Sequence, residues 1–109
     1  MNNYKVYEQF FAKVVEDGNY RRRGKVFQTR NCFYYYDTGT GKVFKCERAV
    51  YEVLKKLQDT NEFERVKELE LNEEEIESAL KQIMESVNNE NILKAPLLET
   101  FSGEQVTDL

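Results

Sequence analysis

Residues 26–57 constrain the fold most, because the spacing of apolar residues changes within this stretch. Residues 32–37 are rich in aromatic side chains, residues 38–41 read Thr-Gly-Thr-Gly, and residues 42–46 alternate again, which is the pattern of a β-hairpin. After Cys46 the apolar period lengthens from two residues to about 3.6, the period of an α-helix. The sequence therefore predicts a small antiparallel sheet that is followed directly by helices.

The remaining elements can be predicted from periodicity and capping residues. An amphipathic helix is expected over residues 4–16, and Asn72 is expected to cap the last long helix. Strands are predicted over residues 25–30, 32–37 and 42–46, and further helices over residues 47–58 and 62–68. The expected fold class is α+β and winged-helix-like: a three-stranded antiparallel sheet followed by three helices, with an extra N-terminal helix.

Length and composition limit the class of protein. A chain of 109 residues is long enough for one domain with its own core. No apolar run approaches the roughly 20 residues that span a bilayer, and the N-terminus lacks the apolar region of a signal peptide. We therefore expect a cytoplasmic protein without a membrane partner, in which the two cysteines, Cys32 and Cys46, remain reduced.

The sequence offers little for catalysis. The chain has no histidine, so no Ser-His-Asp or Cys-His arrangement can form, and two lone thiols fall short of the usual metal site. The glycines at 39 and 41 suit a hairpin turn better than a phosphate-binding loop, and the acidic run 73–75 suits the start of a helix. We expect no catalytic activity, no metal and no cofactor.

Charge is divided between the two parts of the chain. Residues 1–46 hold nine Lys and Arg against four Asp and Glu, a net of +5, whereas residues 47–109 hold seven against sixteen, a net of −9. Two interpretations remain open. The two parts attract each other within one fold, or the basic strands steer an acidic ligand toward the edge of the sheet.

The tyrosine run at 34–36 makes the predicted sheet apolar on both faces. Alternation places Phe33 and Tyr35 on one face and Tyr34 and Tyr36 on the other. One interpretation is that the helices cover one face and the N-terminal helix covers the other. A second, which does not exclude the first, is that an aromatic face is exposed for a partner.

Four successive segments of this chain carry a resemblance to a known family: the aromatic strand, the turn Asp37-Thr38-Gly39-Thr40-Gly41, the short strand, and the helix that starts Glu47-Arg48-Ala49-Val50. The order of these elements resembles that of the RiPP recognition element. This is the PqqD-like peptide-binding domain of ribosomal peptide maturation systems, and the version at the N-terminus of radical SAM maturases is the most similar. The resemblance covers about residues 24–95. Residues 1–23, an amphipathic helix and basic connector, and residues 96–109, a linker or tail, lie outside it. The Cys-x-x-x-Cys-x-x-Cys motif of radical SAM enzymes is absent, so the chain would be an excised domain or a standalone relative.

The resemblance implies a function and a site. In this family the leader of a precursor peptide adds as a strand beside the third strand, in a groove against the last helix, and is thereby presented to a maturation enzyme. Carried over to this sequence, the strand side comprises Val43, Phe44, Lys45 and Cys46, with Lys42 flanking it, and the helix side comprises Ile76, Leu80, Ile83 and Met84. Edge strands offer unpaired backbone groups for such strand addition.

Two alternatives come from other classes of protein. The apolar stripe of the N-terminal helix could pair with a second copy of the chain, which predicts a structural or dimerisation domain. A winged-helix DNA-binding domain would use the last helix, but that helix opens with acidic residues that phosphates repel, so no nucleic-acid partner is expected.

Overall fold

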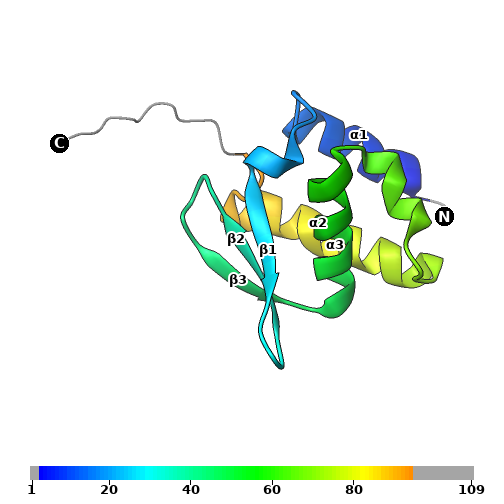
Figure 1. Ribbon diagram of the computed structural model, residues 1–109. Coiled ribbons are helices and arrows are strands. Elements are labelled where there is room, and N and C mark those ends of the chain that lie inside the picture. Colours follow the sequence, from blue (N-terminus) through cyan, green and yellow to red (C-terminus); the bar gives the residue numbers. More distant parts are fainter. Residues whose placement is uncertain (1–2, 95–109) are drawn as a thin grey trace.

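The computed structural model describes residues 3–94. It confirms the predicted α+β fold of an N-terminal helix, an antiparallel sheet and then helices, with the strands on one side of the molecule and the helices on the other (Figure 1). In chain order the elements are α1 (Tyr4–Val14), η1 (Tyr20–Arg22), β1 (Gly24–Gln28), β2 (Phe33–Asp37), β3 (Val43–Cys46), α2 (Arg48–Thr60), η2 (Phe63–Glu68) and α3 (Glu73–Glu90).

The three strands form a meander in the order β1-β2-β3, and both pairs are antiparallel. The β2–β3 connection is the predicted turn: the Gly41 N–H donates to the Asp37 carbonyl at 2.8 Å, and Gly41 adopts a φ of 73° that favours glycine. Gly24 is required at the start of β1, because a Cβ there would collide with the Tyr35 ring and the Tyr36 carbonyl. These contacts fix the register of the sheet.

Helix α2 covers the inner face of the sheet. It packs against β1 and β2, whereas β3 packs mainly against its neighbour β2. The buried side of α2 consists of Val50, Tyr51, Val53, Leu54 and Leu57. Because α2 leaves β3 largely uncovered, the space between β3 and α3 becomes available to a ligand.

Helix α1 belongs to the core and does not cover the sheet. It packs against α3 and η2, where Phe11 is fully buried and stacks on Phe63 at a centroid distance of 5.2 Å. The prediction that this helix lies over the second face of the sheet is wrong, because its apolar stripe is satisfied by α3 and η2. Residues 3–23 therefore share one core with the segment that follows them.

The helix boundaries agree with the predicted ones except for details of the ends. The segment predicted as a helix over residues 62–68 is the 3₁₀ helix η2. Asn72 caps α3 as predicted: its Oδ1 accepts from the Glu75 N–H at 2.8 Å, and Glu75 Oε1 accepts from the Asn72 N–H at 3.2 Å. Asn61 and Asn91 end α2 and α3 in left-handed conformation.

Asp37 joins the hairpin to the segment after α3. This fully buried carboxylate accepts from the Leu93 N–H at 2.9 Å and from the Thr40 N–H at 2.8 Å. The Leu93 carbonyl in turn accepts from Arg23 Nη1 at 3.1 Å. Three distant segments are thus held together beside the start of β3.

Among residues 3–94, no helix is long and apolar enough to cross a membrane. The predicted linker or tail, residues 96–109, lies outside the described residues.

Candidate functional site

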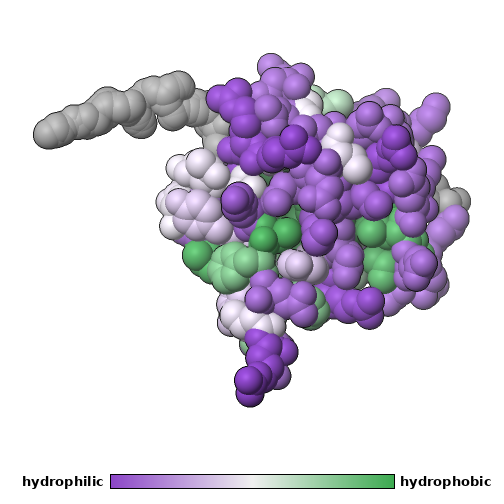
Figure 2. Space-filling view, in the orientation of Figure 1, coloured by the Kyte–Doolittle hydropathy of each residue, from purple (hydrophilic) through white to green (hydrophobic). Residues whose placement is uncertain are grey.

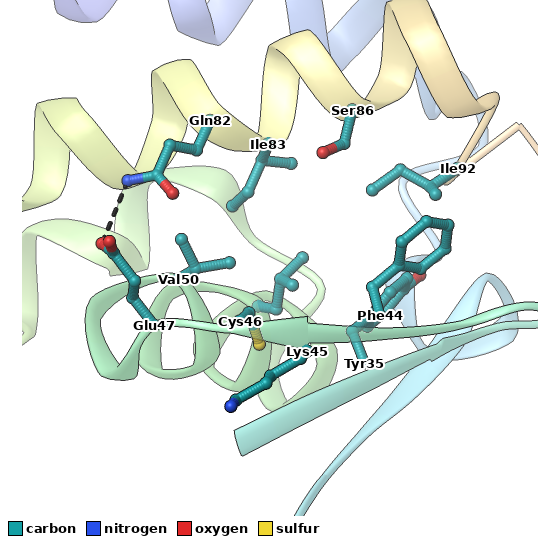
Figure 3. Close-up of a pocket in the computed structure, with 11 residues that line it drawn as sticks. Tyr35, Phe44, Lys45, Cys46, Glu47, Val50, Gln82, Ile83, Ser86 and Ile92 are labelled. Atoms are coloured by element: carbon teal, nitrogen blue, oxygen red, sulfur yellow. Dashed lines mark hydrogen bonds between the residues drawn. The ribbon is translucent and has the colours of Figure 1, made fainter. Parts of the chain in front are cut away.

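A groove of about 380 Å³ lies between β3 and α3 (Figure 3). Strand β3 forms one wall, α3 forms the other, and α2 forms the floor. The lining residues are Tyr35, Phe44, Lys45, Cys46, Glu47, Val50, Leu54, Gln82, Ile83, Ser86 and Ile92.

The groove is apolar inside and polar at the end near Glu47. Val50, Leu54 and Ile83 are buried residues of its floor and wall. At the end near Cys46, Gln82 Nε2 donates to Glu47 Oε1 at 3.2 Å, so a hydrogen bond links α3 to the start of α2 (Figure 3). Such a groove suits a ligand that places apolar groups inside and polar groups at the rim.

The backbone of β3 is open on the groove side. The Asp37 N–H donates to the Lys42 carbonyl at 2.9 Å, so antiparallel alternation directs the backbone groups of Phe44 and Cys46 toward β2. The N–H and C=O of Val43 and Lys45 therefore point outward, and none of the described residues pairs with them.

The other edge of the sheet is partly closed. The outward N–H of Val26 in β1 donates to Gln58 Oε1 of α2 at 3.0 Å. A side chain that occupies an edge donor hinders the addition of another strand. Of the two edges, β3 is therefore the more accessible to an extended peptide.

Not all of the residues predicted for the strand side line the groove. Phe44, Lys45 and Cys46 line the groove, whereas Val43 lies beside it and exposes 54% of its surface. The Lys45 side chain points away from the groove (Figure 3). Lys42 Nζ lies 3.4 Å from Glu90 Oε1, so this lysine ties the hairpin to the end of α3.

Of the residues predicted for the helix side, only Ile83 lines the groove. Ile76 and Leu80 are buried in the core, and Ile76 lies near Tyr4 at the other end of α3. The prediction that Ile76 and Leu80 form the groove wall is therefore wrong, because both side chains pack in the core.

Met84 is also absent from the groove lining, for a geometric reason. At about 100° per residue, Met84 lies roughly 200° around the helix from Gln82. Its flank is that of Glu77, which accepts a 2.7 Å hydrogen bond from Asn3 next to α1. Met84 packs against the core instead.

The sequence did not identify several of the lining residues. Gln82 and Ser86 lie one turn apart on α3, next to the apolar stripe, and this polar pair is the only signal that could have marked the groove side. Val50 and Leu54 belong to the buried side of α2, and Ile92 lies after α3.

Cys46 lies inside the groove as a neutral thiol. Burial raises the pKa of Cys46 to about 11, so at neutral pH this sulfur is a small apolar contact and a weak nucleophile. Both cysteines are free, and alternation places Cys32 and Cys46 on opposite faces of the sheet. Within residues 3–94, no group of three His, Cys, Asp or Glu side chains could hold a metal ion.

The arginine cluster after α1 stabilises the fold. Arg21 donates through Nε to the Gln58 carbonyl at 3.1 Å and through Nη2 to the Asp59 carbonyl at 2.8 Å. Arg23 is buried and lies 2.8 Å from Asp17. Arg21 therefore binds carbonyls at the end of α2, in the acidic part of the chain, whereas the Arg23–Asp17 pair lies within the basic part.

The second face of the sheet is exposed and aromatic. We call it the outer face; it carries Lys25, Phe27, Tyr34, Tyr36, Val43 and Lys45. Phe27 and Tyr34 stack at a centroid distance of 5.1 Å, and Phe27 and Tyr36 expose 42% and 39% of their surface. Figure 2 shows pale and green residues over the strands, at the left of the molecule.

Comparison with known proteins adds no relative: no protein-family model, curated protein or solved structure matches this chain.

Proposed function

We propose that this domain binds an extended peptide by strand addition to β3. The observation that carries the proposal is the open backbone of Val43 and Lys45 beside an apolar groove, when β1 has its edge donor occupied by Gln58. Main-chain hydrogen bonds would supply affinity, and the groove would supply selectivity for alternate side chains.

The resemblance of residues 24–95 to the RiPP recognition element suggests the source of the peptide. The ligand would be the leader region of a ribosomally made precursor, and the domain would present it to a maturation enzyme, such as a radical SAM enzyme. The domain itself would act by raising the local concentration of substrate at that partner's active site. Its neutral Cys46 thiol is consistent with a binding role and no catalysis.

The alternatives have weaker support. The apolar stripe of α1, which suggested dimerisation, is covered within the chain by α3 and η2. The acidic first turn of α3, Glu73 to Glu75, remains exposed, and phosphates would repel it.

Selection from a displayed library of random peptides, followed by variants of the edge, tests the proposal. Val43→Pro removes one outward N–H at the first residue of an edge strand, where proline is tolerated. Loss of one hydrogen bond of about 1 kcal/mol should weaken selected peptides about fivefold, measured by calorimetry. Val43→Ala, which retains the N–H, is the control and should bind nearly normally.

A second variant fills the groove. Ser86→Phe adds a ring to the α3 wall and should abolish binding without disturbing the core, whereas Asn88→Phe places the same ring on an exposed position of α3. If Val43→Pro and Ser86→Phe both fold and bind selected peptides as the unmodified chain does, β3 is not the binding edge.

A further inference from the structure

The geometry of β3 also restricts which peptide would fit, and this restriction rests on the proposed function. A strand added to β3 would form hydrogen bonds with Val43 and Lys45, the residues whose backbone groups point outward. Side chains of directly opposed residues lie on the same face of a sheet. The side chains of the bound peptide would therefore alternate between the outer face and the groove.

Peptide positions opposite Phe44 and Cys46 would point into the groove. The groove lining that they would enter includes Ile83, Leu54 and Ile92, all buried and apolar. An unpaired carboxylate there would lose its hydration without gaining a partner. Both of these positions therefore favour apolar side chains.

The end of the groove near Cys46 strengthens this preference. Glu47 lies there and is hydrogen-bonded to Gln82 at 3.2 Å. A second carboxylate beside Glu47 would meet a like charge, which is unfavourable even at an exposed position. The groove thus excludes acidic residues at the inward positions.

The position between them would lie on the outer face, beside Lys45. The side chain of Lys45 is exposed on that face next to Tyr34, and among residues 3–94 no ion pair engages it. Lys42, the other lysine near the groove, already contacts Glu90. Lys45 is therefore the lysine positioned to attract an acidic residue of the peptide.

We infer that the domain selects an acidic residue flanked on both sides by apolar residues, with the acidic side chain opposite Lys45 and the apolar side chains in the groove. The pattern reads the same in both directions, so it holds for a parallel or an antiparallel peptide. Selectivity would then come from the order of acidic and apolar residues along the peptide, and not from the net charge of the peptide alone.

Three synthetic peptides test this pattern, with binding measured from the amide chemical shifts of Val43 and Lys45. The first has the core Leu-Glu-Val-Glu-Leu, the second is its permutation Leu-Val-Glu-Glu-Leu, and the third is the lysine version Leu-Lys-Val-Lys-Leu, all with the same Gly-Ser flanks. The alternating acidic peptide should bind about tenfold more tightly than the permuted one, because each pair of inward positions within the permuted core includes a carboxylate. The alternating acidic peptide should also bind at least about threefold more tightly than the lysine peptide.

The variant Lys45→Glu should reverse the preference between the acidic and lysine peptides, while Lys25→Glu, on the far strand of the same outer face, should leave it unchanged. Equal binding of the alternating and permuted peptides, or a preference that Lys45→Glu does not alter, would overturn the pattern and leave strand addition intact. If no peptide binds, including those from the displayed library, the proposed function itself fails.

Discussion

At the scale of single residues, the pKa of the Cys46 thiol is the property that depends most directly on how well the groove excludes water. Desolvation raises the pKa of this thiol from the ordinary 9.0 to about 11, although the residue is only partly buried. The proton is therefore held more tightly in the folded chain than in the unfolded chain. Its contribution to stability is fully present below pH 9 and is lost as the pH rises toward 11.

Alkylation of a Cys32→Ser variant, which keeps only Cys46, should follow this shift. We expect the rate of reaction with iodoacetamide to rise with a midpoint near pH 11 in the folded chain and near pH 9 in urea. The free energy of unfolding should also fall between these two values, and less so in a Cys46→Val variant. A folded-state midpoint near 9 would mean that the groove is more hydrated than its lining residues suggest.

At the scale of the element, β3 uses its two backbone directions for different purposes. Phe44 and Cys46 hold the strand to β2, whereas Val43 and Lys45 face the open edge. Proline substitution should therefore destabilise the fold to different extents at neighbouring positions. This distinction could not be made from the sequence, because the phase of the hydrogen-bond ladder depends on how the hairpin closes.

Phe44→Pro should destabilise the fold, because it removes an N–H that is directed toward β2. We expect its free energy of unfolding to fall by about 1–3 kcal/mol in urea denaturation. Lys45→Pro, which removes an outward N–H, should cost less than about half as much, as proline is tolerated on edge strands. Equal losses for the two variants would show that the ladder has the other phase.

The elements themselves could largely be predicted from the sequence. Three signals depend only on neighbouring residues, and the structure confirms each of them. They are the change of period after Cys46, the turn glycines and the Asn72 cap. The groove wall could not be predicted in the same way. The position of α1 decides which side of α3 faces β3. Helix α1 packs on the flank of α3 that carries Met84, so the side with Gln82 and Ser86 lines the groove. Of the residues that the resemblance implied, Phe44, Lys45 and Cys46 of β3 and Ile83 of α3 line the groove.

At the scale of the whole molecule, one core joins the N-terminal helix to the elements that form the groove. Tyr4, Tyr7 and Phe11 of α1 are buried together with residues of η2 and α3. Because α3 also forms the groove wall, α1 supports the site from behind. A chain without α1 would expose the apolar surface of α3 and would lose the support that orients Ile83.

Phe11→Ala tests this role of α1. The ring is fully buried and lies 5.2 Å from Phe63 and 5.4 Å from Phe10, so its removal leaves a cavity in the core. The free energy of unfolding should fall by about 3–5 kcal/mol in urea denaturation. Val6→Ala on the same helix, where Val6 exposes 57% of its surface, should change it by less than about 0.5 kcal/mol. If both variants are equally stable, α1 is detached from the core in solution, and its apolar stripe becomes available to a second copy of the chain; sedimentation of the unmodified chain would then reveal a dimer.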